Sequence, residues 1–273
     1  MVKPLLCGLI GAGIQGSRAP ALQEGEARAQ GLALEYRLID LDVLGVGVEA
    51  LPQLVERCVR DGFSGLNITY PCKQAVMPLL DALSEEARAI GAVNTVVISG
   101  GRKTGHNTDG PGWAWGFQRA LPRADLTRVV LLGAGGAGAA CADALLRLGA
   151  KELLVVDRDA GRAAELAARR GCTAETDLER ALHGASGLVH ATPTGMAKTP
   201  GLPLPAGLLR PDLWVSEVVY VPLETELLRA AKRAGCRVMD GGHMNVGQAA
   251  LGFRLFTGRE ADTARMETLF RAL

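Results

Sequence analysis

Two charged residues, Lys73 and Asp109, each end a short polar motif. Lys73 closes the run NITYPCK (residues 67–73), and Asp109 closes HNTD (residues 106–109). A lysine and an aspartate that meet in a fold can pass a proton to or from a substrate hydroxyl. The later loop GAGGAG (residues 133–138) can bind a dinucleotide, which exchanges a hydride with the same carbon. This combination predicts oxidation of an alcohol or its reverse.

The composition indicates a globular protein and excludes several classes of partner. The chain has 273 residues, 48% of them hydrophobic and 22% charged, which is enough for two domains of ordinary size. A net charge of +1 without a run of like charges predicts no nucleic-acid or membrane partner. The apolar start is broken by glycines at Gly8 and Gly11, too early for a secretory signal or a membrane span. We therefore expect a cytoplasmic protein.

The cysteines and histidines are not spaced as metal ligands. None of the six cysteines forms a Cys-x-x-Cys pair, and most lie in apolar runs, where buried thiols are expected. The four histidines are dispersed without ligand spacing. We expect neither a disulfide nor a metal site.

Short apolar runs alternate with helical patterns, which predicts strand-helix-strand units and a parallel sheet. The expected strands span residues 5–10, 34–39, 65–69, 92–98, 129–132, 153–156, 188–190, 214–218 and 237–239. The expected helices span about 20–31, 51–59, 84–91, 113–120, 137–148 and 160–170, with two more after Met244.

The expected strand at 129–132 begins a second α/β unit. The expected fold class is α/β, with an N-terminal α/β substrate domain and a Rossmann-type, doubly wound parallel-sheet domain that binds NAD. We place the substrate domain at 1–112 and the dinucleotide domain at 113–243. The helices of 244–273 have no partner strand and are expected to pack back on the first domain.

The glycine loop follows a strand and opens a helix, the context in which such a loop binds phosphate. Gly133 allows the tight turn, Gly135 lets the backbone approach the pyrophosphate, and Gly138 lets the helix pack closely. The alternative is a glycine-rich turn that binds nothing. The predicted cofactor-binding residues of the loop are Gly133, Ala134, Gly135, Gly136, Ala137 and Gly138.

Asp157 ends the next strand and bears on the choice of cofactor. A carboxylate there pairs with the ribose 2′-hydroxyl and repels a 2′-phosphate, which favours NAD over NADP. Arg158 and Arg162 are cations that could bind that phosphate, or else belong to a solvated helix. NADP is therefore the second choice.

A series of polar motifs in order along nearly the whole chain resembles the shikimate dehydrogenase family. The similarity is greatest to the NAD-using quinate/shikimate dehydrogenase branch, whose second-strand acid corresponds to Asp157. The motifs are NITYPCK (67–73), GAVNT (91–95), NTDG (107–110), GAGGAG (133–138), ATPTGM (191–196), YVPLET (220–225) and GGHMNVGQ (241–248).

The resemblance implies a role for each matching residue. Lys73 and Asp109 would be the catalytic pair, Asn94 would fix the reacting hydroxyl, and Ser17 would bind the substrate carboxylate at the first helix. The residues implied to contact the substrate from other sides are Thr69, Tyr220 and Gln248. Those implied at the nicotinamide are Gly241, Met244 and Thr192.

Each role has a structural alternative. Lys73 would then be a surface lysine, Asp109 the cap of the helix that follows, and Asn94 a buried link between strands. One position departs from the family, which places two hydroxyl residues one position apart at the first helix. This chain has Ser17 in the first place but Ala19 in the second. Gln15 or a water could replace the lost hydrogen bond, or the substrate could differ at that end of the ring.

The predicted function is NAD-dependent interconversion of a ring hydroxyl and a ketone of quinate or shikimate. The alternatives are a dehydrogenase for a related cyclic hydroxy acid such as aminoshikimate, and a non-catalytic NAD-binding regulator. A regulator needs no proton-transfer pair, so Lys73 and Asp109 argue against it. The expected partner is a small-molecule acid, and the chain is expected to be a monomer or a homodimer.

Overall fold

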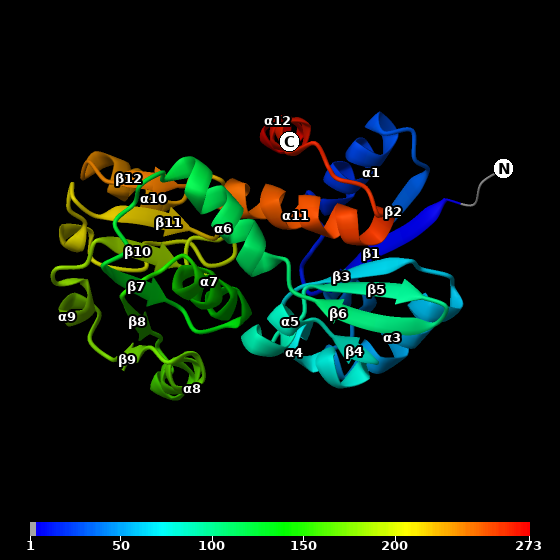
Figure 1. The fold of residues 1–273 in the computed structure, drawn as a ribbon, viewed down its shortest axis with the longest axis horizontal. Helices are drawn as coiled ribbons and strands as arrows, with labels where there is room; N and C mark the ends of the chain where they lie inside the picture. The colour runs from blue at the N-terminus through cyan, green and yellow to red at the C-terminus, as the bar shows by residue number, and fades with distance from the viewer. Residues whose placement is uncertain (1–3) are drawn as a thin grey trace. The chain divides into compact units, whose positions relative to one another are not determined.

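The computed structural model describes residues 4–273, and the chain divides into two compact units. Unit 1 comprises the chain up to Thr108 together with Gln248–Leu273, and unit 2 comprises Asp109–Gly247 (Figure 1). The sequence prediction placed the two boundaries after residues 112 and 243 instead. Both units are α/β, as predicted from the alternation of apolar runs and helical patterns.

Within the described residues, unit 1 is built on a six-stranded sheet in the order β2-β1-β3-β5-β6-β4. Strands β2 and β3 run parallel to β1, whereas β5 is antiparallel to both β3 and β6. The prediction of a parallel sheet is therefore wrong for this unit, whose sheet is mixed. The strands are β1 (Leu5–Gly11), β2 (Leu34–Asp40), β3 (Gly65–Ile68), β4 (Ala82–Leu83), β5 (Thr95–Ser99) and β6 (Arg102–His106).

The antiparallel part comes from a tight hairpin between β5 and β6. Gly100 and Gly101 both have positive φ, at 57° and 81°, the conformation that a two-residue hairpin turn requires. The predicted strand at 92–98 begins only at Thr95, so Asn94 precedes β5. Its N–H still donates to the carbonyl of His106 (3.1 Å), which aligns it with the end of β6.

Helices cover both faces of this sheet. Successive side chains of β1 point to opposite sides, so β1 contributes to the packing on each face. Leu6 and Ile10 join the cluster formed with α3, α4 and α5, whereas Cys7 and Leu9 pack with Phe256 of α11 (Figure 1). The helices of this unit are α1 (Ala19–Ala29), α2 (Leu41–Leu44), α3 (Leu51–Arg60), α4 (Cys72–Ala75), α5 (Glu85–Ile90), α12 (Thr263–Ala272) and the later part of α11 (Gly241–Thr257), with 3-10 turns η1 (Val48–Ala50) and η2 (Met77–Leu79).

The C-terminal helices belong to unit 1 through contacts with α1. Arg265 of α12 donates to both carboxylate oxygens of the buried Glu26 (2.7 and 2.9 Å), and Gln23 donates to the carbonyl of Ala249 in α11 (2.9 Å). The sequence prediction began these helices at Met244, but α11 begins at Gly241.

Unit 2 contains a six-stranded, wholly parallel sheet in the order β12-β11-β10-β7-β8-β9. The chain proceeds from β7 to β8 and β9 on one side, then returns to build β10, β11 and β12 on the other. This is the doubly wound Rossmann-type arrangement that was predicted, with its reversal of strand order between β7 and β10. The strands are β7 (Arg128–Leu132), β8 (Glu152–Val156), β9 (Thr173–Glu175), β10 (Gly187–His190), β11 (Trp214–Glu217) and β12 (Arg237–Met239).

The helices of unit 2 pack on both faces of this sheet. Trp113 and Phe117 attach α6 to β11 of the sheet, because Nε1 of Trp113 donates to Ser216 (3.0 Å) and the Phe117 ring packs edge-on against Trp214 (4.9 Å between centroids). Helix α6 begins at Asp109 rather than at the predicted Trp113. The helices are α6 (Asp109–Ala120), α7 (Gly136–Arg147), α8 (Ala160–Arg170), α9 (Leu178–Leu182), α10 (Glu226–Arg233) and the start of α11, with a 3-10 turn η3 (Ala206–Leu208).

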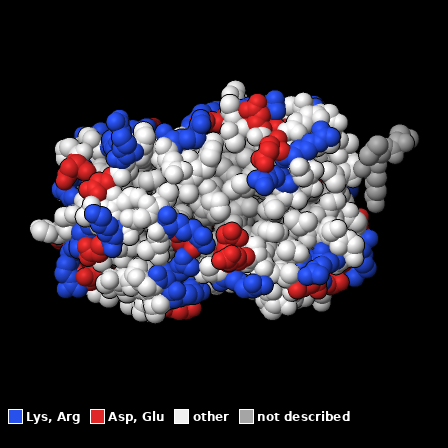
Figure 2. Space-filling model, in the orientation of Figure 1, with Lys and Arg blue, Asp and Glu red and all other residues white. Residues whose placement is uncertain are grey.

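The surface carries charges of both signs. On the face seen in Figure 2, Lys and Arg side chains alternate in small groups with Asp and Glu. Within residues 4–273, no helix combines the length and apolar character needed to cross a membrane.

Candidate active site

Lys73 and Thr69 lie on one tight segment at the carboxyl end of β3 in unit 1. The N–H of Thr69 donates to the carbonyl of Ile10 in β1 (2.9 Å), and the N–H of Cys72 donates to the carbonyl of Thr69 (2.8 Å). Lys73 follows in α4, and its carbonyl accepts the N–H of Val93 (2.9 Å). Both side chains are partly exposed. The backbone of Lys73 is therefore hydrogen-bonded to Val93, the residue that precedes Asn94.

Asn94 connects this segment to the end of β6. Its side-chain oxygen accepts the N–H of Thr108 (2.8 Å), and its side-chain nitrogen donates to the Thr108 hydroxyl (2.9 Å). Both residues are buried. Thr108 directly precedes Asp109, which is 5% exposed and opens α6. Asn94 is thus a buried link, as its structural alternative proposed, and its contact with a substrate stays a prediction.

A second buried amide supports Asn94 from β3. The Tyr36 hydroxyl donates to the side-chain oxygen of Asn67 (2.6 Å), whose nitrogen donates to the Thr95 hydroxyl (3.0 Å) and the carbonyl of Asn94 (3.3 Å). Satisfied buried networks of this kind hold their members in a single arrangement. The residues predicted to bind a substrate hydroxyl therefore rest on a rigid polar layer, in which Tyr36 and Thr95 were not predicted.

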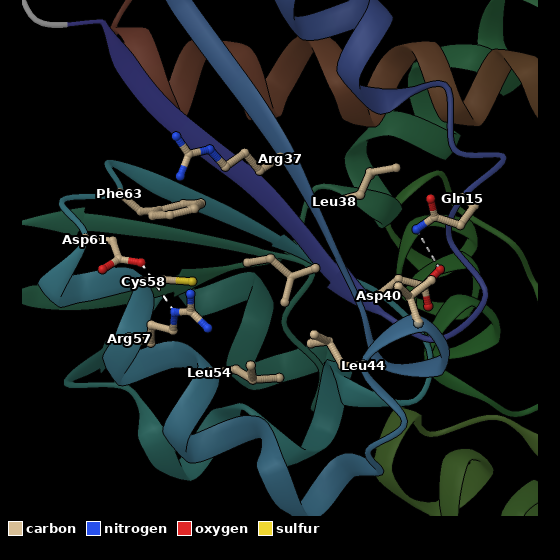
Figure 3. A pocket seen from close by; sticks show the side chains of 12 residues that line it. Gln15, Arg37, Leu38, Asp40, Leu44, Leu54, Arg57, Cys58, Asp61 and Phe63 are labelled. Atoms are coloured by element: carbon tan, nitrogen blue, oxygen red, sulfur yellow. Dashed lines mark hydrogen bonds and ion pairs between the residues drawn. The ribbon is translucent and has the colours of Figure 1, made fainter.

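The loop before α1 is organised by Asp40, a buried carboxylate that the sequence prediction missed. It accepts the N–H groups of Gly13 (2.9 Å) and Ile14 (3.0 Å) and the side-chain amide of Gln15 (3.0 Å), as Figure 3 shows for Gln15. Burial tends to raise the pKa of Asp40, but the hydrogen bonds from Gln15 and the backbone outweigh it, so its pKa lies below the ordinary value. The carboxylate therefore stays charged and keeps the loop fixed near neutral pH.

Ser17 lies at the end of this loop, two residues before α1 begins at Ala19. Its hydroxyl oxygen accepts the N–H of Ala19 (3.2 Å), which leaves the hydroxyl hydrogen able to donate to an anion. The side-chain amide of Gln15, the predicted substitute for the hydroxyl that Ala19 lacks, is held by Asp40 through one of its two hydrogens.

A separate hollow of about 200 Å³ lies beside β2, α2 and α3. Its lining includes Arg37, Leu44, Arg57 and Phe63 (Figure 3). Gln15 and Asp40 of the loop before α1 border it, but none of the residues predicted to bind substrate or cofactor lines it.

The glycine loop of unit 2 has the geometry of a phosphate cradle. Gly133 has φ of 112°, and a Cβ there would lie 2.7 Å from the carbonyl oxygen of Ala191. A Cβ on Gly138 would overlap the carbonyl of Gly133, whereas one on Gly135 would meet nothing within 4 Å. Helix α7 begins at Gly136 without a side-chain cap, so no N-cap side chain competes with an anion for its first N–H groups. Ala134 and Ala137 complete the loop, which fits a dinucleotide pyrophosphate.

Asp157 is held against this loop. Its carboxylate accepts the N–H of Ala134 (2.7 Å) and the N–H of Asp159 (2.9 Å), and it remains partly exposed. Arg162 pairs with Asp159 (3.4 Å), whereas Arg158 is exposed at the start of the same turn. The carboxylate is therefore oriented beside the loop, where it can still accept from ribose hydroxyls.

Thr192, Tyr220 and Gly241 follow the carboxyl ends of β10, β11 and β12, the other half of the unit 2 sheet. Thr192 follows β10, and Tyr220 follows β11, and both are partly exposed. A Cβ on Gly241 would overlap the carbonyls of the residues just before Tyr220, so only glycine lets α11 begin there. Met244 is buried on the first turn of α11, and Gln248 lies further along that helix, in unit 1.

Comparisons with known proteins identify the family. Residues 9–96 match the shikimate dehydrogenase substrate binding domain, residues 117–194 match shikimate / quinate 5-dehydrogenase, and residues 244–269 match the shikimate 5'-dehydrogenase C-terminal domain. A shikimate dehydrogenase (NADP(+)) from Streptomyces avermitilis is 59% identical over 96% of this chain and 93% of its own. The chain belongs to the shikimate dehydrogenase family.

Two solved members of this family have the same fold. Quinate dehydrogenase from Corynebacterium glutamicum, in complex with NAD, is 46% identical, with a TM-score of 0.91 over 99% of each chain. Shikimate 5-dehydrogenase from Thermus thermophilus, in complex with NADP(H) and shikimate, is 38% identical, with a TM-score of 0.89 over 98% of this chain and 99% of its own. The family prediction made from the polar motifs is therefore confirmed.

The described residues of this family member include no group of three or more His, Cys, Asp or Glu that could hold a metal ion. The thiol next to Lys73 is also unsuited to act as a nucleophile, because burial raises the pKa of Cys72 to about 11. Lys73 is therefore a better candidate than Cys72 for the reactive group of this segment.

Substituting serine for Ala19 tests the substrate-carboxylate subsite. If a hydrogen bond is missing there, Ala19→Ser should lower the KM for quinate or shikimate by up to about tenfold, with much less change in kcat. The measurement is steady-state kinetics of variant and parent, with Ala29→Ser at the far, exposed end of α1 as the control. An unchanged or higher KM would mean that Ala19 makes room for a different ring acid.

Proposed function

We propose that this protein is an NAD-dependent dehydrogenase that interconverts a ring hydroxyl and a ketone of quinate or shikimate. The observation that carries the proposal is a buried hydrogen-bond network at one end of the strands of unit 1. It holds together the segment of Lys73, Asn94 and Thr108, the residue before Asp109. The relatives named quinate/shikimate dehydrogenase (NAD(+)), 46% identical over nearly the whole chain, support the same substrate class.

The proposed roles follow from the chemistry of each group. Lys73 and Asp109 exchange the hydroxyl proton, since an ammonium donates and a carboxylate accepts. Asn94 and Thr69 orient the ring hydroxyls, and Ser17 donates to the substrate carboxylate. Tyr220 and Gln248 provide the remaining polar contacts to the ring.

The proposed cofactor is NAD, which when bound exchanges a hydride with the substrate carbon. The glycine loop would hold its pyrophosphate and Asp157 its ribose, while Thr192, Gly241 and Met244 would border the nicotinamide. The relative from Streptomyces avermitilis is named as an NADP(+) enzyme, whereas the Corynebacterium relatives are named as NAD(+) enzymes. The fixed carboxylate of Asp157 supports NAD, because it would repel a 2′-phosphate.

Neutralising Asp157 should shift the cofactor preference. We expect Asp157→Asn to raise kcat/KM with NADP, relative to that with NAD, by about tenfold or more, because like-charge repulsion at a contact costs several kcal/mol. Asparagine keeps an acceptor for the N–H of Ala134, so the loop should hold its shape. If the parent enzyme already prefers NADP, our interpretation of Asp157 is wrong.

The decisive experiment is a steady-state panel of quinate, shikimate and aminoshikimate, each with NAD and with NADP. Turnover of quinate or shikimate with NAD is the expected result. A preference for aminoshikimate would reassign the substrate within the same reaction. Binding of NAD without turnover of any of the acids would favour the regulator.

We also propose that the enzyme acts in the cytoplasm as a monomer or a homodimer, which fits a small acid and NAD as its only partners. Light scattering during size-exclusion chromatography would determine the oligomeric state, and cell fractionation the location.

A further inference from the structure

A buried chain of hydrogen bonds joins the carboxyl ends of β10 and β11 in unit 2. His190 ends β10 and Glu217 ends β11, and both side chains are 0% exposed. His190 Nδ1 lies 2.9 Å from Glu217 Oε1, and its Nε2 lies 2.5 Å from the hydroxyl of Thr192. The carboxylate of Glu217 also accepts the N–H of Val219 (2.9 Å) and the hydroxyl of Thr225 (3.0 Å).

The donors and acceptors along this chain fit one arrangement of hydrogens. The Thr192 oxygen accepts the N–H of Thr194 (3.3 Å), so its own hydrogen can point at Nε2 of His190. The hydrogen on Nδ1 then points at Glu217, whose oxygens act only as acceptors. Each contact is satisfied, so the orientation of Thr192 depends on His190, and that of His190 depends on Glu217.

Glu217 therefore fixes two loops at once. Through His190 it holds residues 191–195, and directly it holds residues 219–225, which include Tyr220. The loops also lie close together, because a Cβ added to Gly195 would lie 3.5 Å from Thr225. A substitution of Glu217 or His190 should therefore change the conformation of these loops more than that of the strands.

The place of this chain in the sheet indicates which part of a dinucleotide lies above it. In doubly wound sheets a dinucleotide lies across the reversal of strand order, here between β7 and β10. Asp157 follows β8 and marks the adenosine side. The nicotinamide half of the dinucleotide would then lie over the carboxyl ends of β10 and β11.

We propose that His190 and Glu217 are positioning residues that hold the 191–195 loop in the shape that receives the nicotinamide half of NAD. Neither residue touches the reacting atoms, because both are fully buried and act through Thr192. This inference rests on the proposed function in taking NAD as the ligand.

Two substitutions at His190 separate its contacts. In His190→Asn, the amide lies near the position of Nδ1 and can still reach Glu217 but not Thr192. In His190→Gln, the amide extends to the position of Nε2 and can reach Thr192. We expect the asparagine variant to bind NAD about tenfold more weakly than the parent, the scale of one lost buried hydrogen bond, and the glutamine variant to recover most of that loss.

The test compares NAD with ADP-ribose, which lacks the nicotinamide, by calorimetry on the intact protein. Affinity for ADP-ribose should stay the same in both variants, because Asp157 and the glycine loop are unchanged. His183→Asn, an exposed histidine after α9, is the matched control and should bind both ligands like the parent. If His190→Asn does not fold, Thr192→Val breaks the same bond from its other end and should give the same selective loss.

Other outcomes would overturn the inference. Equal weakening of NAD and ADP-ribose would mean that His190 only stabilises unit 2, and unchanged NAD binding in His190→Asn and Thr192→Val would remove its role. A parent protein that binds NAD no more tightly than ADP-ribose would also contradict the inference. Turnover of the substrate by that protein would leave the proposed function intact. A parent that binds neither ligand and turns over no substrate would overturn the proposed function and this inference together.

Discussion

Lys73→Ala is expected to lower kcat at least about a hundredfold with quinate or shikimate, the usual scale for the loss of an acid-base group. The affinity for NAD should change little, because the predicted NAD contacts come from unit 2 and Lys73 belongs to unit 1. The measurements are kcat by steady-state kinetics and the Kd for NAD by calorimetry.

Two further lysine variants show what kind of group is needed. Lys73→Arg keeps the positive charge, but a guanidinium does not release its proton near neutral pH, so it should be as slow as the alanine variant. Lys151→Ala removes an exposed lysine of unit 2 and should leave kcat unchanged. A fast Lys73→Arg beside a slow Lys73→Ala would mean that Lys73 acts as a fixed charge, and a fast Lys73→Ala would remove it from the mechanism.

The sequence was most informative where a single rule governs a segment. Strands β7 and β8 are buried on both faces, so residues 129–132 and 153–156 form short, continuous apolar runs that stand out from their neighbours. The glycine loop follows directly from β7, and the positive φ of Gly133 requires the residue type that is present. For these reasons the Rossmann-type unit was predicted nearly strand for strand.

Prediction failed where tertiary contacts decide the structure. Strand β6 (RKTGH) is too polar to be recognised by hydrophobicity, and it pairs because the turn at Gly100 and Gly101 folds it back on β5. That pair of glycines was the available signal for a hairpin, and it shows why the unit 1 sheet is mixed.

The buried polar residues were harder still to predict. Asp40, His190 and Glu217 are each the last residue of a strand, so nothing in the local pattern distinguishes them from surface residues. Their partners are far away in the chain: Asp40 binds the loop at Gly13, and Glu217 binds His190. Only the fold brings such pairs together.

Asp109→Asn is expected to lower kcat about a hundredfold, and combining it with Lys73→Ala should give little further loss. Residues that act together on one proton are strongly non-additive, because removing either already disables the transfer. The structural alternative predicts a different result, since Asp109 also opens α6 and its charge favours the helix N-terminus by about 0.3–1 kcal/mol. A helix-terminal role alone would therefore lower the melting temperature slightly and leave kcat near normal.

The two roles are separated by measuring kcat and thermal unfolding for both single variants and the double variant. We expect a small fall in the melting temperature of Asp109→Asn together with the large fall in kcat, and a double variant about as slow as the slower single one. Losses that multiply to about ten-thousandfold would mean that Lys73 and Asp109 act independently. Asn94 ties Thr108 in place with its side-chain amide, so the backbone entering α6 should remain fixed in every variant, and the kinetic losses can be assigned to the missing side chains.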